Sequence, residues 1–292
     1  MTADLPLVSI IVITYNSSKY VLETLESAKA QTYQNIELII SDDGSTDKTI
    51  EICENWLAEN KERFVHSQII TVEKNTGIPA NCNRGVKASK GEWLKLIAGD
   101  DILLEDCVQL NINFNVENRN LISVSNMICV SGYENRKHSS GEKFKKFFNT
   151  STNQFLMYIR YPLFLNTPSL FYHREVYNKV NGFDERIKIL EDIPFFVKVL
   201  RNNYHIAFNP SFTVKYRLHQ ESLSNKDNIN LNDALKSTFY LFRKDYLNNG
   251  SLLNYIFMKN AEYSYKLNSK PGFNVVRILY NRYYKLFLRM FY

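Results

Sequence analysis

The chain of 292 residues has no long run of apolar residues and no repetitive or compositionally biased segment. A membrane-spanning helix needs roughly 20 consecutive apolar residues, so none is expected. The start, Met1–Asp4, lacks the basic region and apolar core of a secretion signal, which predicts a cytoplasmic protein. With 45% hydrophobic and 23% charged residues, the composition is that of a folded globular protein.

Cysteine is scarce, and one common phosphate-binding turn is missing. The four cysteines are Cys53, Cys82, Cys107 and Cys129. They lack the short-spaced pairs of a thiolate zinc site, so we expect them to be packing residues in a reducing compartment. No Gly-x-Gly-x-x-Gly follows the first apolar run, and its absence disfavours a dehydrogenase.

Acidic and basic residues balance everywhere except near the C-terminal end. Residues 263–292 hold six lysines and arginines and no acid, so the other 262 residues carry 30 of each sign. A nucleic-acid-binding protein would spread its basic residues over a recognition surface, so no nucleic-acid partner is expected. Residues 273–292 predict a helix with an apolar, aromatic side and a basic side, typical of a helix on an anionic membrane. A helix packed on the protein itself or on a partner has the same pattern.

Apolar runs alternate with helical patterns over the first 100 residues. Strands are expected at 7–13, 36–40, 68–72 and 93–97, with helices at 21–28, 50–57 and 79–90. Unbroken apolar strands joined by helices predict a parallel sheet covered on both faces, which binds ligands beyond the carboxyl ends of its strands.

The pattern changes after residue 120. Shorter strands are expected at 121–125, 128–131, 169–172 and 212–217, and helices at 231–246, 252–267 and 273–292. The second half therefore predicts an acceptor region laid against the first half, followed by a helical extension.

Pairs of adjacent acids follow two of the expected strands. Asp42 and Asp43 precede Gly44, and carboxylates at such a strand end can accept hydrogen bonds from a base or ribose. Asp100 and Asp101 would repel each other unless a proton or cation neutralised one of them, so a hard divalent metal is a natural occupant. A capped turn is the alternative interpretation for each pair.

Two further segments carry weaker signals. Glu191-Asp192 precedes Pro194, which suits the first turn of a helix, where the helix dipole favours carboxylates. That structural role alone accounts for both acids. His219 follows the last expected strand, and a lone histidine is more often structural or solvated than a ligand.

Taken together in order and spacing, these segments resemble the family 2 glycosyltransferases of the GT-A fold over about 220 residues. The matching segments are 8–16, 41–47, 75–77, 83–85, 99–101, 182–184 with 191–192, and 216–219 with 222–224. The resemblance implies an α/β fold of GT-A type, with a mostly parallel nucleotide-binding sheet flanked by helices. Residues 1–120 would form the nucleotide-sugar-binding half, 121–225 the mixed acceptor-binding and catalytic half, and 226–292 the helical extension.

The same resemblance assigns roles to individual residues. It implies that the nucleotide sugar is bound by Thr14, Tyr15, Asn16, Asp43, Asn75, Asn83 and Asp100. Mn²⁺ or Mg²⁺ on the diphosphate is expected at Asp100, with Asp101 beside it and His219 as a further contact. Asp192, with Glu191 beside it, matches the general base that deprotonates the acceptor hydroxyl in one inverting displacement.

The substrates follow from the resemblance only in outline. It implies a UDP-sugar that donates a hexosyl or N-acetylhexosaminyl group. The expected acceptor is a lipid-linked saccharide for capsule, O-antigen or another bacterial surface polysaccharide. Together with the basic last helix, this places the enzyme as a peripheral protein at the inner face of the plasma membrane.

The sequence departs from the family pattern at two positions. Ala98 stands where an acid usually begins the metal motif, and Cys82 replaces the arginine that commonly precedes the helix asparagine. These changes leave a catalytically impaired, sugar- or lipid-binding relative as the alternative. A sugar-1-phosphate nucleotidyltransferase is disfavoured because its glycine-rich first loop is absent from residues 14–17.

Overall fold

The computed structural model describes residues 5–131, 134–139, 144–150, 154–160 and 165–219, together with the single positions 141, 222, 259 and 283. Apart from two of these single positions, the helices expected at 231–246, 252–267 and 273–292 lie outside the described residues, as does the extension 226–292 as a unit. Within the described part of the chain, no helix is long and apolar enough to cross a membrane.

The first half is the βαβαβαβ unit predicted from the sequence. Its elements are β1 (Val8–Thr14), α1 (Val21–Lys29), β2 (Ile36–Asp42), α2 (Thr49–Asn60), the short η1 (Lys61–Arg63), β3 (His66–Ile70), α3 (Ile78–Ala88) and β4 (Trp93–Ala98). The four strands lie in the order β3-β2-β1-β4, and every neighbouring pair is parallel. The predicted parallel sheet is thus confirmed.

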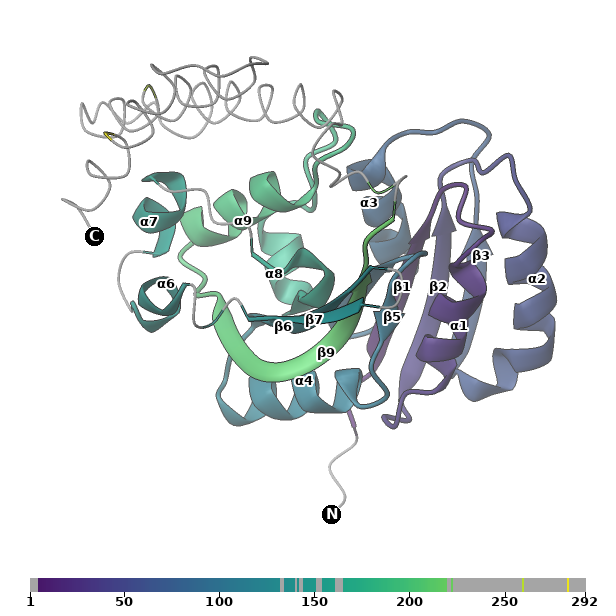
Figure 1. Cartoon of the computed structure of the whole chain (residues 1–292), viewed down its shortest axis with the longest axis horizontal. Helices are drawn as coiled ribbons and strands as arrows, with labels where there is room; N and C mark the ends of the chain where they lie inside the picture. The colour runs from purple at the N-terminus through teal and green to yellow at the C-terminus, as the bar shows by residue number, and fades with distance from the viewer. Residues whose placement is uncertain are drawn as a thin grey trace.

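Alternate residues of β1 face two different cores, because successive side chains of a strand point to opposite faces. Ile10 packs in a cluster that includes Leu25 of α1, whereas Ile11 belongs to a cluster with Val86 of α3. Figure 1 shows α1 and α2 on one side of these strands and α3 on the other. Each such fully buried aliphatic side chain contributes roughly 1.5 to 3 kcal/mol to stability, which explains the unbroken apolar strands.

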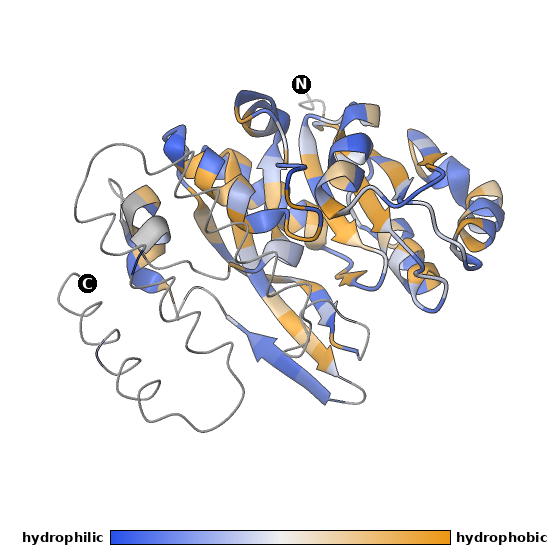
Figure 2. Cartoon of the chain, turned by 90° about the horizontal axis from the view of Figure 1, so that it is seen from above, coloured by the Kyte–Doolittle hydropathy of each residue, from blue (hydrophilic) through white to orange (hydrophobic). Residues whose placement is uncertain are grey.

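The sheet continues into the second half with mixed strand directions. The added strands are β5 (Ile102–Leu103), β6 (Ile122–Ser131), β7 (Glu134–His138), β8 (Phe171–His173) and β9 (Ala207–Arg217). Their order beyond β4 is β8-β6-β9-β5, and β8 runs antiparallel to both β4 and β6. β7, the uniformly hydrophilic strand in Figure 2, pairs with β6 alone and is mostly exposed.

One expected pair of strands is a single strand, which corrects the prediction of separate strands at 121–125 and 128–131. β6 runs through both segments, and its pairing with β9 shifts register around Ser125 and Asn126. Asn126 donates to the carbonyl of Pro210, and the Ser125 hydroxyl lies 2.5 Å from that of Thr213. The extra residues lie in β9, which is curved in Figure 1, and the Asn126 side chain satisfies one of its carbonyls. β6 therefore continues through the irregularity without ending.

The strand expected at 169–172 is also different. The 3₁₀ turn η2 (Thr167–Ser169) comes first, and the short strand β8 begins only at Phe171. The sequence did not predict the remaining helices, although it did place Pro194 in the first turn of one of them. They are α4 (Cys107–Glu117), α6 (Lys145–Asn149), α7 (Gln154–Arg160), α8 (Arg174–Lys179) and α9 (Asp192–Arg201).

Candidate active site

The carboxyl ends of three parallel strands meet at one edge of the sheet. Thr14 at the end of β1 is in register with Asp42 of β2, and Ile13 is in register with Ala98 of β4. The polar loops that follow these strands are therefore neighbours, although they are separated by up to 85 residues in the sequence. This edge is where the sequence predicted ligand binding.

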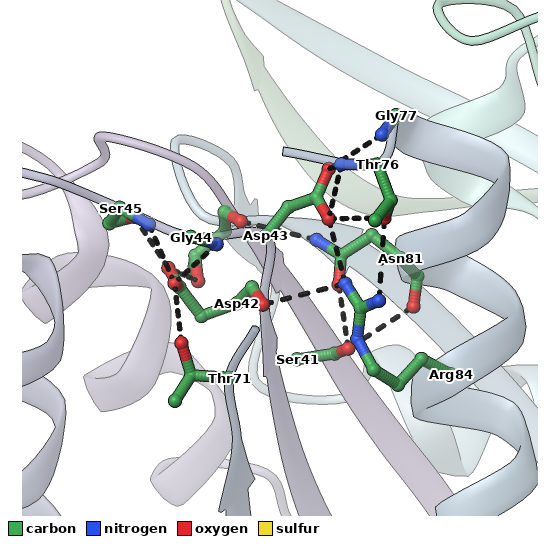
Figure 3. A network of polar contacts seen from close by, with 11 residues as sticks. Ser41, Asp42, Asp43, Gly44, Ser45, Thr71, Thr76, Gly77, Asn81 and Arg84 are labelled. Atoms are coloured by element: carbon green, nitrogen blue, oxygen red, sulfur yellow. Dashed lines mark hydrogen bonds and ion pairs between the residues drawn. The ribbon is translucent and has the colours of Figure 1, made fainter. Parts of the chain in front are cut away.

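Asp42 is a structural acid that organises the loop after β2. Its fully buried carboxylate accepts hydrogen bonds from the Thr14 hydroxyl at 2.9 Å and from the Ser45 amide at 2.8 Å. The Gly44 amide and the hydroxyls of Ser45 and Thr71 donate to it as well. Figure 3 shows Gly44, Ser45 and Thr71 gathered around this carboxylate. Gly44 has φ +78°, in the left-handed region that favours glycine.

Asp43 joins the loop after β2 to the loop that precedes α3. Its carboxylate accepts from the amide and hydroxyl of Thr76 and from the Gly77 amide, and it forms an ion pair of 2.8 Å with Arg84. Burial alone would raise the pKa of Asp43, but the hydrogen bonds from Thr76, Arg84 and Gly77 lower it. Asp43 therefore stays ionised while its oxygens are engaged within the chain.

The other predicted nucleotide contacts of this edge, Tyr15, Asn16 and Asn75, are all exposed. Asn16 has φ +50° and joins its loop to the loop after β2, since its backbone amide donates to Ser45 Oγ and its side-chain oxygen accepts from the Thr46 amide. That hydrogen bond engages the Asn16 side chain within the chain, which leaves Tyr15 and Asn75 more available to a ligand.

Two asparagines of α3 face different parts of the protein. The side chain of Asn83 accepts from the Phe183 amide and the Tyr177 hydroxyl, which places it against the second half rather than at the strand ends. Asn81 is the one that reaches the strand ends, where it donates to the Thr14 carbonyl and accepts from Ser41 and Arg84. Asn81 and Arg84 were not among the predicted site residues. Their spacing of three residues, which puts them on one helix face, was the available signal.

The side chains of the two acids after β4 have different partners. Asp100 Oδ2 lies 2.9 Å from His219 Nε2, so the structure brings together two residues that are 119 positions apart. Asp101 is 1% exposed, and its carboxylate accepts from the Arg217 amide at 2.9 Å. Burial, followed by the charge of Asp100, raises the pKa of Asp101 well above its usual value.

Arg217 and Tyr20 support the Asp100–His219 pair. The Arg217 side chain donates to the Asp100 carbonyl and to Glu23 of α1, and its guanidinium lies 4.6 Å from the centre of the Tyr20 ring. The same ring is 5.0 Å from that of His219. Tyr20 carried no signal in the sequence, because only the fold brings it beside a strand that ends near residue 217.

Asp100 and His219 offer an oxygen and a nitrogen ligand at a separation compatible with one cation. The described residues contain no group of three or more His, Cys, Asp or Glu side chains arranged for a metal. Mg²⁺ and similar hard ions commonly bind one or two protein groups and complete their shell with phosphate oxygens and water. The pair therefore fits a metal that arrives with a diphosphate, and Asp101, engaged by Arg217, is the less available ligand.

Glu191 and Asp192 lie at the start of α9, in a segment that is tied to the start of α3. The Ile78 amide at the start of α3 donates to the Lys188 carbonyl at 2.7 Å, which ties this segment to the loop held by Asp43. Asp192 accepts from the Ile193 amide at 2.7 Å and from the Thr167 hydroxyl at 3.1 Å. Burial raises the pKa of Asp192, and burial together with the Asp192 charge raises that of Glu191 to about 8. Burial therefore favours the protonated form of Glu191.

This raised pKa makes stability depend on pH. An unfolded glutamate releases its proton near pH 4.5, whereas folded Glu191 keeps it to about pH 8, so stability falls as pH rises through that window. Glu191→Gln removes the cost of ionising this carboxyl in the folded protein. The melting temperature of the variant, relative to that of the unsubstituted protein, is therefore expected to increase from pH 5 to pH 9. The exposed Glu51→Gln, measured in the same buffers, serves as the control. A difference for Glu191→Gln that is flat with pH would contradict the expectation.

Comparisons with known proteins place this arrangement in a family. The model of glycosyl transferase family 2 matches residues 9–180. An uncharacterized glycosyltransferase of Rickettsia typhi is 30% identical over 229 residues, which cover 75% of this chain and 66% of that protein. Glycosyltransferase GlyG of Streptococcus pneumoniae is 38% identical over 104 residues, covering 35% of this chain and 33% of GlyG.

Solved structures show the same fold. The crystal structure of S. aureus TarS 1-349 in complex with UDP-GlcNAc superposes with a TM-score of 0.60 at 20% identity. The match covers 91% of this chain and 82% of that one, and it confirms the predicted GT-A type α/β fold. The chain spans two thirds or less of the two curated relatives named above. Because the family model matches more than half of the chain, the chain belongs to glycosyltransferase family 2.

Proposed function

We propose that this chain transfers a sugar from a nucleoside diphosphate, with uridine as the base, to an acceptor hydroxyl with inversion at the anomeric carbon. The observation that carries the proposal is the placement of Asp192. Its carboxylate lies at a helix start that is tied to the nucleotide-side loops through Ile78 and Lys188, while Asp100 and His219 form a second polar pair after β4 and β9. A base and a diphosphate-binding pair are the two parts that such a displacement requires.

In the proposed reaction, Asp192 accepts the proton of the acceptor hydroxyl as that oxygen attacks the anomeric carbon. The new carbon–oxygen bond forms as the bond to the diphosphate breaks on the opposite face, so one displacement inverts the centre. Glu191, whose pKa is raised by burial and by the Asp192 charge, is less suited to the same task. Mn²⁺ or Mg²⁺ held by Asp100 and His219 would neutralise charge on the leaving diphosphate.

Nucleotide binding is assigned to the loops at the carboxyl ends of β1, β2 and β3. Tyr15 and Asn75 are exposed there, and Thr14, Asn16 and Asp43 hold the loops in place. TarS binds UDP and UDP-GlcNAc, which supports a uridine nucleotide for this chain as well. We assign Asn83 a supporting role, because its hydrogen bonds join α3 to the second half.

The direct test is a donor panel. The purified chain, with Mn²⁺, a set of nucleotide sugars and a lipid-linked saccharide acceptor, is expected to release nucleoside diphosphate from one donor well above the background rate. Release that requires the acceptor identifies transfer rather than hydrolysis. Donor binding without turnover across the panel would favour a catalytically impaired, sugar- or lipid-binding relative. Ala98, which stands in place of the usual acid, is the reason for this alternative.

The acceptor and the location are inferred together. A lipid-linked saccharide of a bacterial surface polysaccharide, such as capsule or O-antigen, would be met at the inner face of the plasma membrane. The basic, aromatic segment 273–292 suits an anionic surface of that kind.

Removing residues 273–292 is expected to weaken binding to anionic membranes by at least about tenfold, since each basic residue near such a surface contributes about 1 kcal/mol. Co-sedimentation with phosphatidylserine-containing liposomes measures the effect, which is expected to be larger at low salt. Neutral phosphatidylcholine liposomes are the control. Equal sedimentation with and without the segment would indicate that it packs on protein instead.

A further inference from the structure

A lysine is completely buried in the middle of the sheet. Lys95 of β4 has 0% exposure and lies in register with Ile10 of β1. Burial lowers the pKa of its ammonium, while the neighbouring Cys107 and Asp101 act in the opposite direction. A buried ammonium is retained only where its hydrogen bonds are used, so the groups that Lys95 contacts indicate its role.

Lys95 bonds to a turn, and no ion pair of its ammonium appears in the part of the chain that the structure describes. Its Nζ donates to the carbonyl of Pro168 and, at 3.4 Å, to that of Leu170. The pairing of β4 with β8 ends at Leu94 and Tyr172, so the chain before β8 leaves the ladder at this point. The ammonium supplies donors for carbonyls that β4 no longer satisfies.

The same turn reaches Asp192 through its first residue. Thr167 of η2 donates its hydroxyl to Asp192 Oδ2 at 3.1 Å. The other end of η2 is fixed to β6, because the Ser169 hydroxyl donates to the Ser125 carbonyl and accepts from the Ser125 amide. η2 is thus anchored by β6 on one side and by Lys95 on the other, with Thr167 facing the proposed base.

We propose that Lys95 is a positioning residue, which holds η2 so that Thr167 orients the Asp192 carboxylate for proton transfer. The proposal rests on the proposed function, in which Asp192 is the base. The Asp192 charge raises the pKa of two neighbouring groups: Glu191 beside it, and Tyr158 of α7, a buried hydroxyl without a partner among the described residues. Neither donates a hydrogen bond to Asp192, so Thr167 is the side-chain donor that sets its orientation.

Thr167→Val removes the hydroxyl and keeps the shape of the side chain. A hydrogen bond to a charged group of this kind is worth roughly a tenfold change in rate, so kcat is expected to fall by about that factor. Because the hydroxyl stabilises the ionised carboxylate, its loss should move the acidic limb of the kcat/KM profile to higher pH. The affinity for UDP, measured by calorimetry, should stay within about twofold. Thr32→Val, at an exposed threonine, is the matched control.

Lys95→Met replaces the ammonium with an apolar side chain of similar length. It is expected to lower kcat and to move the acidic limb in the same direction as Thr167→Val, with UDP affinity retained. Lys90→Met, the same change at an exposed lysine five positions earlier, should alter neither. If Lys95→Met does not fold, Lys95→Gln, which keeps an N–H donor of shorter reach, is measured for the same shift.

The double variant tests whether the two residues act in series. If Lys95 works through Thr167, Lys95→Met combined with Thr167→Val should lose no more activity than the more affected single variant. Losses that multiply, or a folded Lys95 variant with an unchanged acidic limb, would overturn the proposal. Asp192→Asn is measured in parallel to separate two failures. If Asp192→Asn stays active, Asp192 is not the base and the proposed function itself is contradicted. If Asp192→Asn is inactive but Thr167→Val is unaffected, only the role assigned to the turn is contradicted.

Discussion

Asp192→Asn is expected to lower kcat by about 10²- to 10⁴-fold, the usual contribution of a general base. Asparagine keeps the size of the side chain and an oxygen that can accept from Thr167 or Ile193, but it cannot take up the acceptor proton. The measurement is the initial rate of nucleoside diphosphate release at saturating donor and acceptor, with melting temperature as the check on folding.

Two controls make this result specific. Asp106→Asn changes an exposed aspartate before α4 that makes no capping hydrogen bond, and it should leave kcat unchanged. Glu191→Gln distinguishes the two adjacent acids: the raised pKa of Glu191 favours its protonated form, so its loss should cost far less than the loss of Asp192. Turnover that survives Asp192→Asn but not Glu191→Gln would reverse the assignment.

The first half of the fold was predictable because its signals are local. Strands such as β1 and β2 are buried on both faces, so nearly every residue is apolar, and the helices between them show the expected periodicity. Parallel neighbours then bring their carboxyl ends to one edge, which predicts that the polar loops meet there. That step needs only the order of the elements.

The second half depends on contacts that a local pattern does not encode. β6 looks like two strands because Ser125 and Asn126 interrupt its apolar residues, yet these side chains satisfy a bulge in β9 about 85 residues away. Lys95 is likewise a charged residue within an apolar strand, and its ammonium is buried against η2. In each case a distant backbone carbonyl or hydroxyl decides the structure.

The sequence indicates two acid pairs at strand ends, but the members of each pair could not be told apart from it. The Asp42 carboxylate accepts from Thr14 and Ser45, whereas that of Asp43 binds Thr76 and Arg84. Asp100 meets His219, whereas Asp101 accepts from the Arg217 amide. Adjacent residues at a strand end point in different directions, so the two acids of each pair bind different groups.

Asp100→Ala is expected to remove the metal dependence of nucleotide binding. With Asp100 absent, His219 alone is a poor site for a hard cation, and metal affinity should fall by at least about 10- to 100-fold. Calorimetric titration of UDP in Mn²⁺ and in EDTA measures the effect as the ratio of the two affinities. That ratio should exceed 1 in the unsubstituted protein and approach 1 in Asp100→Ala, with Asp106→Asn as the control.

His219→Ala separates a metal ligand from a supporting residue. If His219 is a ligand, its loss should reduce the Mn²⁺-dependent affinity ratio, as the loss of Asp100 does. If His219 only orients Asp100 through their 2.9 Å contact, the ratio should stay nearer its original value, because the carboxylate remains. A full Mn²⁺ effect in Asp100→Ala would contradict the site altogether. A metal would then have to act through another acid, such as Asp101, whose carboxylate accepts from the Arg217 amide in this structure.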